Sequence, residues 1–434
     1  MNLSSNSKNK NKISLSIFKI LLIVSIIAAI FVTIRFVLIL KKFTKLGLLN
    51  FRIISKTKVQ RDPTLIWAVT SNPSNDIDYL KSITVHESGV YIVGNDLQLG
   101  NSQWRIEKRS SESGNLIWVV TQNYSDFSDS ANDVIADFSG VYIVGNSGEK
   151  PEWKIEKRDI KEGNLIWSVT SALGMANSVI SDDTGIYVGG YDKTLGNAQW
   201  RIEKRDKTNG ELIWEVTSNP SEWFDTVKSM AIDKTGIYLV GIESKEKESF
   251  QLWRIEKRNL NDGSLIWVAT SNPGVINNVY SVVVDEKGLY ISGTEATKTQ
   301  NTLIGKSLWR IEKRSIVDGN LIWVVNSNVE SETESAEGPV LLAIDGTGLY
   351  VVGNYLISGL DSEWRIEKRN PNDGSLISLH TLNYSKGSDI PRSIAIDDSG
   401  IYIGGIDNQP DDRFPGRLFF KKTDLEWRIE KRKK

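Results

Sequence analysis

Six oxygen-bearing side chains occupy the same position in successive copies of a sequence repeat and could bind a hard cation. Each lies 11 residues before the first glycine of a Gly-[Val/Ile/Leu]-Tyr-x-x-Gly motif; the third of the seven copies has Gly174 at this position. Carboxylate and amide oxygens are the ligands that Ca²⁺ prefers. If the repeats form a ring, these side chains could surround the mouth of its channel; the alternative is that each one caps its own loop. The six residues are Asp78, Asp129, Asp225, Asn277, Glu337 and Asp389.

Two aromatic residues flank members of this acidic set. Phe127 comes shortly before Asp129, and Trp223 comes shortly before Asp225. An exposed aromatic ring can stack on a sugar, whereas a buried one would only pack its loop. Trp223 and Phe127 are therefore candidate ligand-binding residues.

Several kinds of chemistry are excluded by composition. The chain has no cysteine, which excludes disulfides, thiol nucleophiles and iron–sulfur ligation. With only His86 and His380, a multi-histidine metal site is not expected. Residues 1–61 carry 12 basic and no acidic side chains, so the rest carries 41 basic and 54 acidic ones. An acidic main body argues against nucleic acid as a partner, because binding phosphates requires a basic face.

Three signatures recur seven times each beyond residue 63, at an average spacing of about 53 residues. One is Trp-[Arg/Lys]-Ile-Glu-Lys-Arg, one is Leu-Ile-Trp with Ser378 replacing the last Trp, and one is the Gly-x-Tyr-x-x-Gly motif. Each repeat contains four runs rich in β-branched and aromatic residues, separated by Asn, Asp, Gly and Ser, which is typical of strands and turns. We therefore expect an all-β fold, a seven-bladed β-propeller of four-stranded antiparallel blades.

Loop lengths distinguish the two faces of this ring. The two tryptophan motifs are always 14 residues apart, and a three-residue Asp-x-x-Gly step before the tyrosine motif is equally constant, with His86 replacing the Asp once. By contrast, 7 to 21 residues separate the tyrosine motif from the next tryptophan. In a four-stranded blade the constant turns lie on one face and the variable loops on the other. The variable-loop face is the candidate binding surface, and its longest insertion is residues 406–426.

The two ends of the repeat region are complementary. The region begins with a single outer strand, residues 65–70, and ends with a third strand, residues 427–432, that lacks an outer neighbour. We expect residues 65–70 to complete the blade formed by residues 389–432 and so close the ring without an open edge. A parallel β-solenoid is the structural alternative, and the hairpin turns disfavour it.

Residues 185–214 resemble the pyrroloquinoline-quinone-type β-propeller repeat. In that repeat a strand ending in Asp-x-x-Thr-Gly leads to a docking tryptophan, and Asp206, Gly210 and Trp214 match it. The resemblance covers nearly all of residues 63–434 and implies the propeller fold. It implies no quinone cofactor, because the eight blades and vicinal cysteines typical of quinoprotein dehydrogenases are missing.

The N-terminal segment has the composition of a membrane anchor. Residues 13–40 are apolar apart from Lys19 and Arg35, which is long enough to span a bilayer. A cleaved signal peptide is the alternative, but its apolar core would be shorter. Lys8, Lys10, Lys12 and Lys19 precede the uncharged core of the span, and Lys41, Lys42, Lys45 and Arg52 follow it, so the positive-inside rule assigns no orientation. The expected organisation is a basic tail (1–12), a transmembrane helix (13–40), a basic tether (41–62) and the propeller (63–434).

These observations predict a single-pass protein of the cell membrane whose propeller lies outside the cytoplasm. We expect the propeller to be a rigid binding scaffold, with a protein or glycan ligand on its variable-loop face and calcium as its candidate cofactor. The alternatives are a propeller enzyme, an oxidoreductase or lyase acting at the channel mouth, and a structural or adhesion protein. The inner-strand residues Ser82, Ser178, Ser229, Ser281 and Ser393 are nearly uniform, whereas a catalytic channel should contain a few unequal polar residues.

Overall fold

Antiparallel strands make up the part of the chain that this computed structural model describes. The described residues are 62–434, apart from 73, 75–77, 98–99, 247–249, 273, 275, 297–306, 328–334, 359–360, 386 and 409–424. The chain divides into two units, residues 1–62 and 63–434. The predicted tail, transmembrane helix and tether therefore lie outside the described residues, except for Asp62. Within the described ranges, no helix has the length and apolar character needed to cross a bilayer.

Twenty-seven strands form six antiparallel sheets in the described residues. Five sheets have four strands, and the sixth has seven because β9 ends one blade and begins the next. The strands of the first three blades are β2 (Tyr79–His86), β3 (Gly89–Asp96), β4 (Gln103–Arg109), β5 (Leu116–Gln122), β6 (Ser130–Asp137), β7 (Gly140–Ser147), β8 (Glu152–Arg158), β9 (Leu165–Asp182), β10 (Gly185–Asp192), β11 (Gln199–Arg205) and β12 (Leu212–Ser218). The remaining strands are β13 (Thr226–Asp233), β14 (Gly236–Glu246), β15 (Phe250–Arg258), β16 (Leu265–Ser271), β17 (Ile276–Asp285), β18 (Gly288–Ala296), β19 (Ser307–Arg314), β20 (Leu321–Ser327), β21 (Ser335–Asp345), β22 (Gly348–Ser358), β23 (Asp361–Arg369), β24 (Leu376–Leu382), β25 (Ile390–Asp397), β26 (Gly400–Asn408), β27 (Leu425–Arg432) and β1 (Leu65–Ser71).

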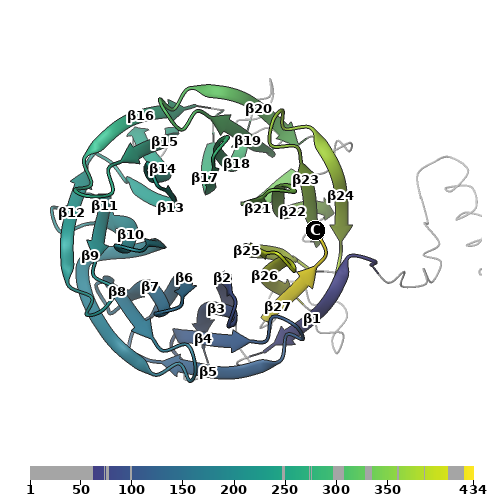
Figure 1. Cartoon of the computed structure of the whole chain (residues 1–434), viewed down its shortest axis with the longest axis horizontal. Coiled ribbons are helices and arrows are strands. Elements are labelled where there is room, and N and C mark those ends of the chain that lie inside the picture. The colour runs from purple at the N-terminus through teal and green to yellow at the C-terminus, as the bar shows by residue number, and fades with distance from the viewer. Residues whose placement is uncertain are drawn as a thin grey trace, which may run out of the picture. The chain divides into compact units, whose positions relative to one another are not determined.

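Seven blades are arranged around a central axis (Figure 1). The inner strands are β2, β6, the second half of β9, β13, β17, β21 and β25, and the outer strands form the circumference. The predicted all-β, four-stranded antiparallel architecture is confirmed. Its cause is the repeated pattern of β-branched and aromatic strands joined by tight turns.

The ring closes as the sequence predicts. β1 pairs antiparallel with β27, from Leu65 opposite Arg432 to Ser71 opposite Trp427. The ladder is extended by Lys433, whose amide donates to the Thr64 carbonyl at 2.8 Å. The last blade is therefore built from both ends of the propeller (Figure 1), and no blade lacks its outer strand.

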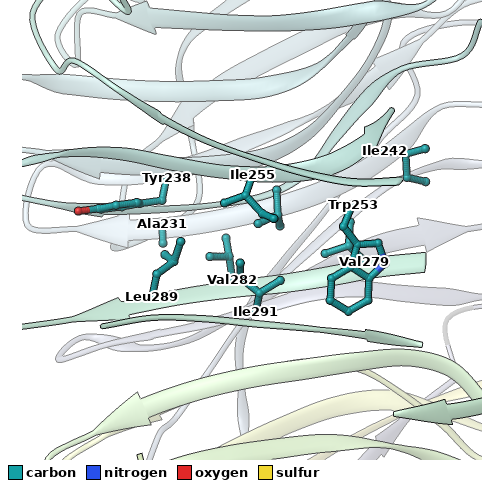
Figure 2. Packing of buried hydrophobic residues seen from close by; sticks show 10 residues of the cluster. Ala231, Tyr238, Ile242, Trp253, Ile255, Val279, Val282, Leu289 and Ile291 are labelled. Atoms are coloured by element: carbon teal, nitrogen blue, oxygen red, sulfur yellow. The ribbon is translucent and has the colours of Figure 1, made fainter. Parts of the chain in front are cut away.

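Apolar side chains between neighbouring blades form the core. In one such cluster, Trp253 and Ile255 of the fourth blade pack against Val279 and Ile291 of the fifth (Figure 2). The seven tryptophans of the Trp-Arg-Ile-Glu-Lys-Arg motifs are fully buried. At the closure, a Cβ on Gly94 would lie only 2.7 Å from the Trp427 ring, so the glycine makes room for the indole.

The charged residues of the same motif form buried ion pairs. Glu256 is fully buried and accepts from Arg254 at 2.6 Å and from Arg258 at 2.7 Å. Within the motif these pairs run along one strand, between residues two apart, and the first arginine also pairs across strands, as Arg254 does with Glu243 at 3.0 Å. Residues two apart share a face of the strand, so one glutamate can lie between two arginines.

The turns at the ends of these strands use the same arginines. Arg258 also donates to the carbonyl of Gly263 in the following hairpin at 2.9 Å, and equivalent bonds recur in five other blades. Lys257 donates to the carbonyl of Ile316 in the next blade at 2.9 Å, while Trp267 donates to the same oxygen. The constant turns of one blade are thereby held to the blade before.

Deleting residues 63–71 tests the closure. We expect the melting temperature of the full chain to fall by about 5 °C or more, because the β1 ladder and the packing of Trp67 are lost; in a large domain, 1 kcal/mol shifts it by about 2–4 °C. Calorimetry checks this, with deletion of residues 2–10 as a control of equal length. An unchanged melting temperature would contradict a closure that stabilises the ring.

Replacing Lys154 by Arg tests the buried ion pairs. Lys154 stands where the other motifs have Arg, and Glu156 is left with one buried carboxylate oxygen that has no hydrogen-bond partner. Burial raises the pKa of Glu156, whereas the pKa of the equivalent Glu312 is lowered: burial opposes this, but Arg314, Ser271 and Arg310 outweigh it. We expect Lys154→Arg to stabilise the fold at pH 7 by about 1–2 kcal/mol.

The gain should depend on pH. It is fully present above the raised pKa of Glu156 and is lost as the pH falls through it, because a protonated glutamate no longer pairs with the new arginine. Denaturant unfolding between pH 4 and 8 measures this, with exposed Lys150→Arg as the control. A gain that is independent of pH would show that it does not come from Glu156.

Candidate functional site

The predicted rim carboxylates are buried and cap their own loops. Asp129 accepts from the Tyr124 amide at 2.7 Å, the Ser125 hydroxyl at 2.8 Å and the Gly148 amide at 3.2 Å. Asp225 is held in the same way by Ser221 and the Ser244 amide. The remaining carboxylates with this arrangement are Asp78 and Asp389, and all four are fully buried.

One of these carboxylates, Asp389, lies near a second buried acid that an arginine neutralises. Burial raises the pKa of Asp389 to about 6, and repulsion from Asp407 adds to the shift. Asp407 in turn lies 3.8 Å from Arg428. In the part of the chain described, no group of three or more histidine, aspartate or glutamate side chains is arranged to hold a metal. The contacts observed are those of the capping alternative, and calcium stays a prediction.

The other two rim residues differ from the aspartates. The Asn277 side-chain amide donates to the carbonyls of Gln251 and Gly274, each at 3.0 Å. Glu337 pairs through its backbone with Asn354 in β22, and its side chain lies outside the described part. Of the set, Asn277 therefore also contacts its own loop.

The two predicted aromatic residues are exposed on the variable-loop face. Phe127 is 48% exposed and Trp223 is 39% exposed. They lie on equivalent loops of different blades, leading into β6 and β13, and Asp129 and Asp225 hold those loops in place. Trp223 is followed by exposed Phe224, whose ring meets Tyr191 edge-on at 5.1 Å. These rings are available to a ligand, but they belong to separate loops.

Contacts between loops confirm which connections share a face. The loop after β3 bonds to the loop before β6, because the Asp129 amide donates to the Ser102 carbonyl at 2.8 Å. The same contact recurs between Asp225 and Ala198. The variable connections therefore lie together, at the end where each inner strand begins.

A central cavity opens along the axis and is lined by all seven inner strands. Toward the constant turns its walls are apolar, with side chains such as Val85, Ile232 and Ile396. Toward the variable-loop face it has a volume of about 180 Å³ and is lined by polar side chains. These include Lys81, Asn132, Asn177, Lys228, Tyr280 and Arg392.

A β-bulge places each of these six polar residues. In β2 the register shifts between Leu80 and Ser82, so Lys81 is an extra residue without its own partner in β3. The same shift occurs at each of the other five positions. A bulge re-aims a side chain while the strand on either side keeps its pairing. In the sixth blade the irregularity is longer, and Val340 is buried.

The serines next to the bulges join neighbouring inner strands. The Ser229 hydroxyl accepts from the Val282 amide at 3.3 Å, and the Ser281 hydroxyl accepts from the Leu342 amide at 3.2 Å. Ser178 and Ser393 make the equivalent bonds. In the second blade Asp133 takes this place and accepts from the Val179 amide at 2.8 Å. The uniform serines are therefore structural.

The bulge residues carry positive charge without a matching carboxylate. Burial lowers the pKa of Lys81, and nearby Arg392 lowers it further. The surrounding strands also lower the pKa of Lys228, although its side chain still reaches channel water. In the described residues, no ion pair involves these three cations. Asp133 also lines the cavity, but Ser82, Val134 and Val179 occupy its oxygens.

These channel residues were missed by the sequence analysis. The repeats agree at the serine position, and this agreement predicted a channel without unequal polar residues. The structure corrects this, because the bulge sets a second residue toward the channel. The signal was the preceding column of the repeat, which reads Lys, Asn, Asn, Lys, Tyr, Val and Arg.

Comparison with known proteins places the chain by fold alone. No family model matches it, and no curated protein does. Among solved structures, the RRP9 WD40 repeats match with a TM-score of 0.52 and 10% identity, over 84% of this chain and all of that one. A quinohemoprotein alcohol dehydrogenase from Pseudomonas putida HK5 matches with a TM-score of 0.47 and 9% identity, over 84% of this chain and 76% of that one. Drosophila Plexin A, in complex with Semaphorin 1b, matches with a TM-score of 0.46 and 9% identity, over 85% and 87%.

Fold and cavity together define a β-propeller with an axial, unevenly polar channel. At 10% identity, the WD40 likeness supports the fold and nothing finer. The strand topology agrees with the propeller architecture that the resemblance to the pyrroloquinoline-quinone-type repeat implies.

Proposed function

We propose that this protein is a membrane-tethered binding scaffold whose ligand enters the propeller from the variable-loop face. The observation that carries the proposal is the uneven set of bulge residues in an otherwise repetitive channel. Seven blades with the same three motifs hold the ring in one shape, and the variable loops and the bulge positions differ in chemistry from blade to blade. Differences confined to one end of a rigid fold are typical of a binding site.

The exposed aromatic residues support the same face. Phe127 and Trp223 are on loops whose backbones are fixed by buried carboxylates, so their rings are presented without an ordering cost at binding. Such rings suit the apolar face of a sugar or a side chain of a protein partner. A glycan or protein ligand is thus compatible with this surface.

Ligand screening of the full chain in detergent tests the proposal. We expect members of a panel of sugars, sugar acids, sugar phosphates and amino acids to raise the melting temperature. For a ligand that contacts the loops, Phe127→Ala and Trp223→Ala should weaken binding about tenfold, as removal of one stacking ring does. Phe138→Ala is the matched control, because Phe138 is 78% exposed on a constant turn of the other face.

Two results would count against the proposal. Binding that is lost in Phe138→Ala and retained in the loop and channel variants would place the site on the constant-turn face. A panel without any shift would leave the structural or adhesion alternative.

A propeller lyase is the second candidate function, favoured by the unequal polar residues in the channel. Lys81 has a lowered pKa beside Arg392, which suits a base next to a group that neutralises a carboxylate. Mass spectrometry of each screened compound after incubation distinguishes the two functions. Conversion of a ligand would favour the enzyme, and recovery of the unchanged ligand would favour the scaffold.

The membrane tether has its own test. Residues 13–40 are proposed as a single-pass anchor and residues 41–62 as a basic tether on anionic headgroups. Deleting residues 2–40 should move the protein from the carbonate-resistant membrane pellet to the supernatant. Replacing Lys8, Lys10 and Lys12 by Gln is the control and should leave it in the pellet. A deleted chain that still pellets would contradict the anchor, and protease protection of the full chain reports which side the propeller occupies.

A further inference from the structure

We infer that the polar end of the channel is a binding site for a small hydroxylated organic anion, such as a sugar acid or a sugar phosphate. The inference deepens the proposed function and rests on it for the direction of entry. It is carried by three cations that bulges in separate blades direct into one cavity: Lys81, Lys228 and Arg392.

The charges in this cavity are not balanced by the protein. Elsewhere in the described ring, buried arginines are paired with carboxylates, as Arg258 is with Glu256 at 2.7 Å. In the same described part, Lys81, Lys228 and Arg392 have no such ion pair, and the buried Arg392 Nε has no hydrogen-bond partner. Two of these cations, Lys81 and Arg392, are close enough to repel one another. A bound anion would relieve that repulsion, and the surrounding low-dielectric walls would strengthen its attraction.

Neutral groups in the same layer suit hydroxyl groups of the ligand. Asn132, Asn177 and Tyr280 come from three further blades and line the same space. The Asn132 and Asn177 amides already donate to carbonyls of neighbouring inner strands, Ala176 and Val227, each at 2.9 Å, so their positions are fixed. A ligand can therefore contact side chains that are already held in place, so that little entropy is lost in ordering them on binding.

The size of the cavity favours a small molecule over a macromolecule. About 180 Å³ of space is available at this end, which is below the roughly 300–1,000 Å³ typical of pockets for drug-sized ligands, so it suits a single small ligand or its anionic head. Toward the constant turns the described lining of the channel contains side chains such as Val85, Ile232 and Ile396 and no lysine or arginine. An anionic head would therefore stop at the bulge layer.

Isothermal titration calorimetry of the full chain in detergent tests this site with glucuronate and glucose 6-phosphate. Glucose is the neutral comparison, inorganic phosphate tests for the anion alone, and a hexaglutamate peptide tests for an acidic protein segment. We expect at least one sugar anion to bind at least tenfold more tightly than glucose. Each of Lys81→Gln, Lys228→Gln and Arg392→Gln should weaken that binding about tenfold or more, as loss of a charge-assisted hydrogen bond does.

Lys234→Gln is the matched control and should bind like the native chain. Lys234 is an exposed lysine of the same blade as Lys228, at the constant turn of the opposite face. Lys228→Gln should leave the fold intact, because the Lys228 side chain is exposed. Melting curves of each variant establish that the ring is intact.

Several results would overturn the inference. They are equal binding of glucose and the sugar anions, no binding of any anion, binding that Lys234→Gln removes as much as Lys228→Gln does, and binding of the peptide alone. If anions fail while a neutral ligand still depends on Trp223 or Phe127, the proposed function stands and only the anion site is lost.

Discussion

The packing of one tryptophan against one glycine of the next blade is the contact on which the ring depends. Trp253 meets Gly293 so closely that an added Cβ would lie 2.4 Å from the indole, and also 2.1 Å from the Asn278 carbonyl of the paired strand. The same contact joins Trp427 to Gly94, which are at opposite ends of the propeller sequence. Because interiors are closely packed, a large side chain fits only where its neighbour has none. The repeat therefore keeps both residues, and the blade spacing follows from them.

The buried ion pairs make the packing of neighbouring blades more specific. A glutamate between two arginines is costly to bury, and it is tolerated because every oxygen is paired. In several blades the preceding blade supplies one more bond, as when the Ser271 hydroxyl donates to Glu312 at 2.6 Å. These bonds need a single blade-to-blade register, so they specify the arrangement that the apolar contacts allow. Where Lys154 replaces an arginine, the pairing at Glu156 is incomplete.

Much of the fold could be predicted from the sequence because every level of it repeats. The strands, the Asp-x-x-Gly turns and the closure by residues 65–70 follow from spacing alone, and the turn carboxylates act as expected, with Asp233 accepting from the Thr235 amide at 2.7 Å. The glutamate held between two arginines of its own strand could not be predicted, because alternation along a strand does not say which carboxylate each arginine contacts. The β-bulges of the inner strands could not be predicted either, since one extra residue leaves the alternation of inward and outward side chains intact in the strand segments on both sides of it.

The bulge explains how such a repetitive chain can hold an uneven site. In a regular inner strand, a residue facing the channel would be tied to the ladder and to its neighbours in the next blade. The serine position is constrained in this way, since its hydroxyl bonds the adjacent inner strand. The bulged residue has no ladder partner, so Lys81, Asn132 or Tyr280 can occupy it without altering the blade. The serine position therefore stabilises the ring, and the bulged residue before it sets the chemistry of the channel. The channel can vary while the scaffold stays the same.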